Sequence, residues 1–136
     1  MPDEHAHWFV VLSHLTLLSS AYAWGKGHAD LSLATGSVWL SSQIFWRRHR
    51  CKLRRNIDIV VVQLALWYHL HRARSLDTET MRVYLLVMGM AVVSFGPAVF
   101  FTKTDTFELS TLFHSAVHVL ANIGNVLLYT CLPPVS

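Results

Sequence analysis

Long apolar stretches, separated by short polar turns, dominate the chain. Each approaches or reaches the roughly 17–25 residues that an α-helix needs to cross a bilayer. The stretches cover residues 7–24, 29–46, 56–71, 81–101 and 108–132. The pattern predicts an all-α, polytopic integral membrane protein with about five transmembrane helices. We expect residues 1–136 to form a single transmembrane unit with no soluble domain.

The second stretch is the least apolar of the five, because serine, threonine and Gln43 dilute it. Small hydroxyl residues allow helices to pack closely against one another in lipid. We therefore predict a helix that is buried among its neighbours. If residues 31–46 do not cross the membrane, four helices span it and the predicted topology changes.

The last stretch carries polar residues at helical spacing. They follow one another at steps of four, four, three and four residues, which places them on one helix face. The stripe consists of His114, His118, Asn122, Asn125 and Tyr129. Such side chains form hydrogen bonds between helices in lipid, each contributing about 1 kcal/mol. We predict an interhelical polar stripe, and expect a neighbouring subunit to lie against it because so small a chain buries little surface.

Charge is scarce and concentrated. Charged residues make up 14% of the chain, whereas soluble proteins contain about a quarter. Six of the eleven Lys and Arg residues lie in one segment: Arg47, Arg48, Arg50, Lys52, Arg54 and Arg55. The segment is typical of a loop on the cytosolic or matrix side of a membrane, and we expect it to bind anionic phospholipid headgroups such as cardiolipin. Nucleic-acid binding is not expected, since the basic residues do not spread over a larger face.

Four of the nine histidines lie inside expected spans, where ionisable groups suggest function. His114 and His118 are one turn apart, a spacing that allows two imidazoles to bind one zinc ion. Asp58, or His14, is the candidate third ligand. The implied activity is a zinc-dependent intramembrane hydrolase, although no H-E-x-x-H motif is present. The other histidines lie in termini, loops or span ends and need no special role: His5, His7, His28, His49 and His71.

Haem b is the alternative cofactor. Two axial histidines from facing helices at similar depth hold such a haem. With five spans, the first and last helices run in the same direction, so His14 can be at the depth of His114 or His118. This alternative predicts a membrane electron carrier.

The order Ser41 or Ser42, Asp58 and His114-x-x-x-His118 faintly resembles the Ser, His, Asp and HxxxH pattern of the seven-helix intramembrane ceramidase and progestin-receptor-like superfamily. Trp46 stands where that family's first histidine would follow the serine, and the chain has two expected spans fewer. These departures leave the chain unassigned to that superfamily.

Asp58 also has an explanation without catalysis. An anion near a helix N-terminus is stabilising, and we expect it to pair with Arg54 or Arg55. Cys51 and Cys131 are far apart and imply no disulfide framework. The acidic N-terminus is not typical of a secretory or transit peptide.

Together these features favour a small non-catalytic accessory subunit of a large respiratory-chain type complex, packed against other membrane subunits and lipid, with no cofactor of its own. The expected location is the mitochondrial inner membrane, with another organelle membrane or the endoplasmic reticulum as alternatives.

Overall fold

The computed structural model describes residues 3–48 and 50–133, and all regular structure in this part of the chain is α-helical. The helices are α1 (Asp3–Leu12), α2 (His14–Gly25), α3 (Ala29–Trp46), α4 (Lys52–Ala73), α5 (Thr78–Lys103) and α6 (Phe107–Cys131). The predicted all-α fold is confirmed. The first expected helix is divided into α1 and α2, and α4 begins and ends beyond the expected 56–71.

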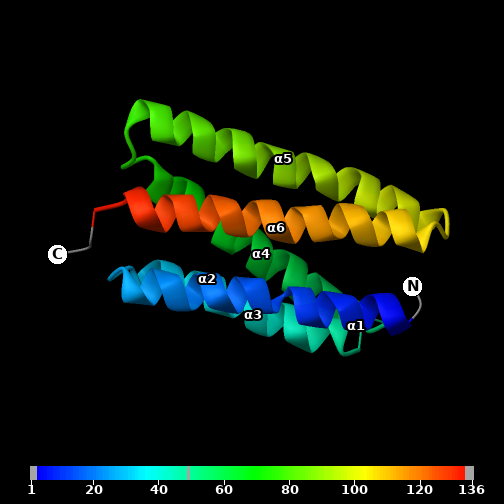
Figure 1. Cartoon of the computed structure of the whole chain (residues 1–136). Helices are drawn as coiled ribbons and strands as arrows, with labels where there is room; N and C mark the ends of the chain where they lie inside the picture. Colours follow the sequence, from blue (N-terminus) through cyan, green and yellow to red (C-terminus); the bar gives the residue numbers. More distant parts are fainter. Residues whose placement is uncertain (1–2, 49, 134–136) are drawn as a thin grey trace.

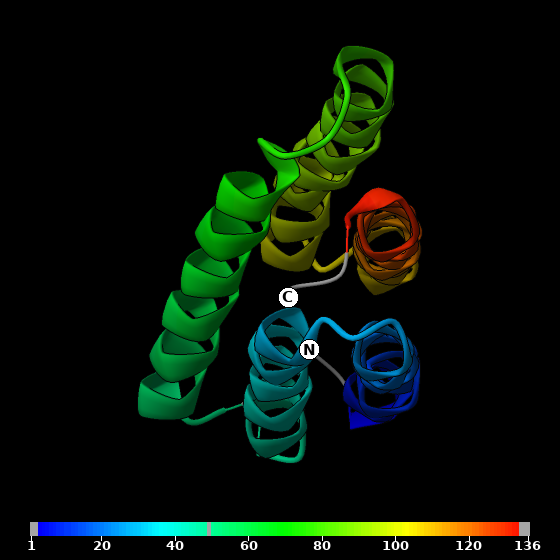
Figure 2. The same cartoon turned by 90° about the vertical axis from the view of Figure 1, so that its left-hand side faces the viewer.

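The helices form an arc around a shared interior. α1 and α2 follow one another along nearly the same line, with α3 beside them and α6 beside α2 (Figure 1). Viewed from the end, the order around the arc is α4, α3, α2, α6 and α5 (Figure 2). α4 packs mainly on α3, whereas α5 packs mainly on α6. The arc therefore closes least tightly between α4 and α5.

A polar side chain from α3 stabilises the break between α1 and α2. Gln43 Nε2 donates to Val10 O at 2.9 Å and to Ser13 Oγ at 2.7 Å. Ser13 Oγ also donates to Val10 O at 2.8 Å. A helix interruption leaves carbonyl groups without their usual partners, and a buried carbonyl needs another donor. Gln43 supplies that donor, which the hydrophobic pattern of residues 7–24 did not reveal.

Short turns join the helices, and local geometry fixes where the helices begin. Gly27 has a φ of 83° in the turn between α2 and α3, a conformation that glycine adopts without steric penalty. Asp77 caps α5, because its carboxylate accepts from Glu79 N at 3.1 Å and Thr80 N at 3.0 Å. Asp105, with a φ of 57°, lies in the turn between α5 and α6.

The tightest packing lies between α5 and α6. Tyr84 and Met88 of α5 contact the buried face of α6 around Gly124. A β-carbon on Gly124 would lie 2.6 Å from Met88 Sδ, so the glycine permits this close approach. Leu128 and Tyr129 continue the same buried cluster. Close contact through a small residue is typical of helix packing in lipid.

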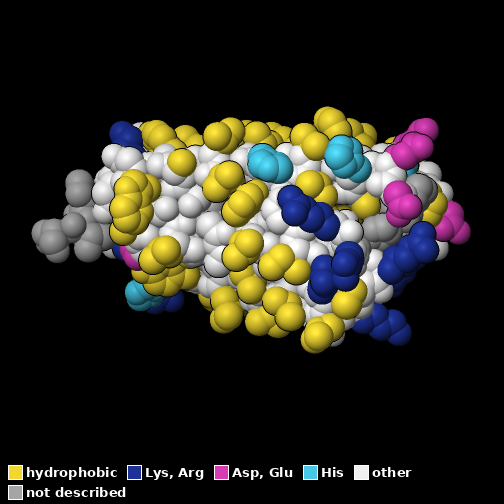
Figure 3. All heavy atoms as spheres, turned by 90° about the horizontal axis from the view of Figure 1, so that it is seen from below, with side chains coloured by type: hydrophobic (Ala, Val, Ile, Leu, Met, Phe, Trp, Pro, Cys, Tyr) yellow, Lys and Arg dark blue, Asp and Glu magenta, His cyan; other side chains and the backbone are white. Residues whose placement is uncertain are grey.

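Polar residues lie inside the bundle and large apolar residues lie outside. In α3, Ser32, Thr35 and Gln43 are buried, whereas Leu33 is 71% exposed and Leu40 is 53% exposed. This reverses the arrangement that water imposes on a soluble helix. The face of the molecule in Figure 3 shows hydrophobic side chains over its middle and left-hand parts, and Lys and Arg side chains toward its right-hand end.

Two helices of the described chain, α5 and α6, are long and apolar enough to cross a membrane. α1 and α2 are too short individually, with 10 and 12 residues. α3 is diluted by hydroxyl residues, and charged residues lie near both ends of α4. Helix length and composition thus indicate a membrane protein only weakly, and they do not confirm five spans.

Candidate functional site

A cavity of about 300 Å³ lies within the arc of helices. Most of its wall is apolar. The polar side chains on the wall come from α2, α3, α4 and α6: Thr16, Thr35, Ser42, Asp58, Gln63, His69, His114, His118, Asn122 and Asn125. An apolar cavity with a few polar groups is the usual form of a small-molecule site.

The rim of the cavity lies between α4 and α5. Ile59 and Val62 of α4 line the cavity and are themselves 45% and 37% exposed. Val92 and Phe95 of α5 also line it and are 56% and 46% exposed. Side chains that line a cavity and also reach the outer surface mark its opening. The opening is therefore lateral, on the side of the bundle, and mainly apolar, with Gln63 of α4 as an exposed polar side chain on it.

Asp58 lies in the second turn of α4 and faces α3. Its Oδ1 accepts hydrogen bonds from Ser41 Oγ at 2.7 Å and from Ser42 Oγ at 2.9 Å. The expected pairing with Arg54 or Arg55 is wrong: Arg54 donates instead to Ile44 O at 3.2 Å, and Asp58 forms no ion pair within the described chain. Two consecutive serines thus replace the arginine as partners of this carboxylate.

Aromatic rings surround His114 on α6. The centroid of its ring lies 4.3 Å from that of Phe9, 5.3 Å from that of Trp46 and 6.4 Å from that of Phe95. The ring of His118 lies 5.1 Å away, one turn along the same helix. Neither imidazole hydrogen-bonds to another residue of the described chain, and both line the cavity.

The rest of the α6 stripe contacts other helices of the same chain. Asn122 Oδ1 accepts from Ser19 Oγ of α2 at 2.5 Å, and Asn122 Nδ2 donates to His118 O at 2.7 Å. Asn125 lines the cavity. The expected neighbouring subunit is therefore not needed to cover Asn122, because α2 already covers it.

Tyr129, the last residue of the stripe, joins three helices. Its hydroxyl lies 2.5 Å from Thr35 Oγ1 of α3 and 2.7 Å from His69 Nε2 of α4. His69 Nδ1 lies 2.7 Å from Ala65 O, and a carbonyl only accepts. His69 therefore carries its proton on Nδ1, and Nε2 accepts from one of the hydroxyls.

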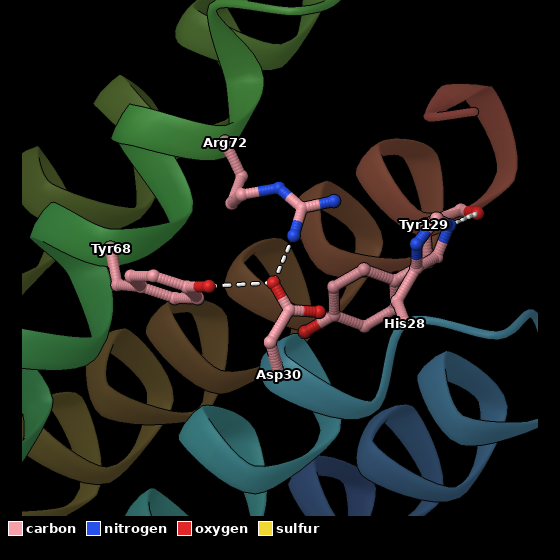
Figure 4. A network of polar contacts seen from close by, with 5 residues as sticks. All are labelled: His28, Asp30, Tyr68, Arg72 and Tyr129. Carbon is pink, nitrogen blue, oxygen red and sulfur yellow. Dashed lines mark hydrogen bonds and ion pairs between the residues drawn. The ribbon is translucent and has the colours of Figure 1, made fainter. Parts of the chain in front are cut away.

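A second polar network closes the bundle at the end where α2, α4 and α6 finish (Figure 4). Asp30 Oδ2 accepts from Tyr68 Oη at 2.6 Å and forms an ion pair with Arg72. His28 is 1% exposed, and its Nε2 lies 3.2 Å from Tyr129 O. His28 lies in the turn between α2 and α3, as expected, but it is buried there and does not face solvent. The sequence analysis did not predict this ion pair of Asp30 with Arg72. An acidic residue at the start of α3 and a basic residue at the end of α4 could have indicated it.

The zinc and haem sets are not assembled as expected. No three His, Cys, Asp or Glu side chains of the described residues are close enough together to hold a metal ion. His114, His118 and Asp58 nevertheless line one cavity. His14 does not line it: the imidazole is exposed, its Nδ1 lies 2.9 Å from Val10 O, and its ring faces Trp39 at 6.2 Å.

The basic segment lies at the end of the bundle that also holds the start of α1 and the turn between α5 and α6 (Figure 1). Arg47, Arg48, Arg50, Lys52 and Arg55 are exposed, and Arg54 is half-buried. Arg50 pairs with Asp3 across the surface at 3.9 Å. His49 lies outside the described residues. Cys51 and Cys131 are free thiols at opposite ends of the bundle.

Comparison of the chain with protein-family models, with curated proteins and with solved structures gives no match.

Proposed function

We propose that this chain is a five-span membrane protein that binds an amphiphilic small molecule in its lateral cavity. The observation that carries the proposal is the cavity itself. Its wall holds polar groups that make no hydrogen bond to another described residue, among them His114, His118 and Asn125. These half-buried groups retain hydrogen-bonding atoms on the cavity wall, so a partly polar ligand fits this wall. The mainly apolar opening between α4 and α5 suits a ligand that arrives from the hydrocarbon phase.

The inside-out distribution of side chains supports the membrane part of the proposal. Large apolar side chains cover the outside of the helices, and hydroxyl and amide groups fill the contacts between them. α1 and α2 together form the first span, and α3 to α6 form the others. At about 1.5 Å per residue, the 18-residue α3 is about 27 Å long, close to the roughly 30 Å of a hydrocarbon core.

The number of basic residues at the two ends of the bundle supports an orientation of the protein in the membrane. The end with the basic segment carries seven Lys and Arg residues: Arg47, Arg48, Arg50, Lys52, Arg54, Arg55 and Lys103. The other end carries four: Lys26, Arg72, Arg74 and Arg82. The positive-inside rule then puts the basic end in the cytosol, or in the matrix of an organelle.

The two cysteines test the topology. We expect an impermeant maleimide, added outside sealed cytosol-side-in vesicles, to label Cys131 in Cys51→Ser but not Cys51 in Cys131→Ser. Permeabilising the vesicles should equalise the two variants. Labelling of both cysteines from one side would contradict five spans.

A cavity-filling variant tests ligand binding. Ala121 lines the cavity, whereas Ala21 is exposed on α2. Protein purified in detergent should carry a co-purifying amphiphile at a fixed ratio, detected by mass spectrometry of an organic extract. Ala121→Phe should lose it and Ala21→Phe should keep it. Absence of such a compound from the wild type, or its persistence in Ala121→Phe, would contradict the proposal.

The other functions stay predictions that the same sample tests. Zinc at one equivalent would favour the intramembrane hydrolase, and a Soret band would favour a haem carrier. The prediction of an accessory subunit in a mitochondrial complex relied in part on a neighbouring subunit that covers the α6 stripe. Because α2 covers Asn122, that argument no longer applies to this residue. A monodisperse, stable chain in detergent would count against an accessory subunit. Binding of the basic segment to cardiolipin is tested with vesicles that contain or lack this lipid.

A further inference from the structure

The cavity wall contains a carboxylate of which one oxygen has no hydrogen-bond partner in the described chain. Ser42 Oγ donates to Oδ1 of Asp58 at 2.9 Å, and Ser41 Oγ, whose single proton is shared with Val38 O at 3.0 Å, lies 2.7 Å from the same oxygen. Oδ2 accepts no hydrogen bond from another described residue. A hydroxyl has a single proton to donate, so neither serine can serve both oxygens. Asp58 therefore retains an acceptor on the wall of the cavity.

No basic side chain of the described chain neutralises this carboxylate. Arg54, one turn before Asp58, is directed at Ile44 O. Arg55 is exposed. The titratable groups that share the cavity wall are His69, His114 and His118, of which His69 is engaged with Ala65 O and Tyr129 Oη. A carboxylate in an apolar setting is stabilised by a cation more than by any neutral donor.

Aromatic rings line the same cavity. Trp46 and Phe95 both border it, and both lie against His114. The faces of such rings attract ammonium groups, and an aromatic wall beside a carboxylate is a common way to bind an organic cation. This observation is independent of the hydrogen bonds of Asp58, and it points to the same kind of ligand.

Apolar side chains of α4 and α5 on the wall fit a hydrocarbon chain, whereas Thr35 of α3 and Asn122 and Asn125 of α6 keep other parts of the wall polar. Asp58 lies six residues after the first residue of α4, or about 9 Å from the basic end of the bundle. From there the wall continues along Val62 and Leu66 of α4 and along Val92 and Met88 of α5. A ligand would hold its polar group near the basic end and extend its tail toward the bundle centre.

We propose that the ligand of the cavity is an amphiphile with a protonated amino group, held by Asp58 between Trp46 and Phe95. The inference rests on the proposed binding function and names the class of ligand. The proposed site binds a long-chain amine and opens to the bilayer. It replaces the metal site that the sequence predicted at Asp58, His114 and His118.

Three probes of equal length test the ligand class. Dodecylamine, dodecanol and dodecanoate are titrated onto the full chain in phosphatidylcholine nanodiscs at pH 7, with native mass spectrometry counting bound probe. We expect saturable 1:1 binding of dodecylamine, at least tenfold tighter than that of dodecanol, and no binding of dodecanoate. Equal affinity for amine and alcohol, or preference for the carboxylate, would overturn the assignment. This comparison needs no variant.

Asp58→Asn then tests the residue, with Asp105→Asn as matched control. Asp105 is an exposed carboxylate in the turn between α5 and α6. The first variant should bind dodecylamine and dodecanol equally, and the second should match the wild type. An unchanged preference for the amine in Asp58→Asn would refute the role of Asp58. If dodecanol binds as tightly as dodecylamine and Ala121→Phe abolishes both, only the ligand class fails. If no probe saturates and no compound co-purifies, the proposed function fails as well.

Discussion

Replacing glycine by alanine should lower stability at Gly124, which contacts Met88, but raise it at Gly89. A β-carbon added at Gly124 would lie 2.6 Å from Met88 Sδ and 3.2 Å from Met88 Cγ. Gly89 on α5 has open space around the same position, with nothing within 4 Å. Alanine at either site removes the backbone freedom of glycine in the unfolded chain, which stabilises a helix by about 0.5–1 kcal/mol. Only Gly124→Ala also has to move a buried side chain.

The magnitude follows from these two terms. Overpacking a buried contact destabilises by about 1–3 kcal/mol. Subtracting the gain in helix propensity leaves Gly124→Ala destabilised by about 0–2.5 kcal/mol, whereas Gly89→Ala should be stabilised by about 0.5–1 kcal/mol. Removing the obstacle with Met88→Ala should reverse the sign of Gly124→Ala. The coupling energy between the two sites is then about 1–3 kcal/mol.

The assay is the free energy of unfolding in detergent micelles, measured by denaturant titration with helicity as the signal. It covers the wild type, Gly89→Ala and the double-mutant cycle of Gly124→Ala and Met88→Ala. Equal shifts at Gly89 and Gly124, or additivity of the two substitutions in the cycle, would refute the reasoning. Either result would mean that α5 and α6 do not approach each other through Gly124.

Three further predictions concern polar contacts outside the cavity. Gln43→Leu should destabilise the bundle by about 0.5–1.5 kcal/mol, since Val10 O and Ser13 Oγ each lose one donor while Val10 O keeps Ser13 Oγ and His14 Nδ1 as partners. Hydrogen exchange should accelerate at residues 10–14, and unchanged exchange there would contradict the role of Gln43. Arg72→Met should lower stability by about 1 kcal/mol, a value reduced because the ion pair with Asp30 is partly exposed. Asp30→Asn should lower stability little further in the Arg72→Met background. Full additivity of the two substitutions would disprove the pairing. The pKa of Asp77 lies below its usual 3.8, because its carboxylate accepts hydrogen bonds from the Thr80 side chain, the Thr80 backbone and the Glu79 backbone. The ionised cap therefore stabilises the fold fully above pH 3.8, and this stabilisation is lost as pH falls through the lower pKa of the folded state. Asp77→Asn should therefore lose this acid dependence, and a stability difference from the wild type that is constant from pH 6 to pH 2 would contradict it.

The sequence by itself determined the all-helical class and the shared face of α6, but not the break between α1 and α2. Long runs of Leu, Val, Ile and Phe with short polar turns favour helices, because a helix satisfies the backbone hydrogen bonds within one segment. Helical spacing alone put His114, His118, Asn122, Asn125 and Tyr129 on one face, because that relation depends only on residues within one helix.

Tertiary structure decided what each of these side chains meets. Asp58 pairs with Ser41 and Ser42 across two helices, in place of an arginine on its own helix. Gln43 stabilises a break thirty residues earlier in the chain, at Ser13. The cavity exists because α4 packs on α3 while α5 packs on α6, which separates the two walls. Periodicity fixes the direction of a side chain around its own helix axis, but the order of helices around the arc depends on packing between segments distant in sequence. That packing places His114, His118, Asn122 and Asn125 on the wall of a cavity within the chain, and Tyr129 against Thr35 and His69.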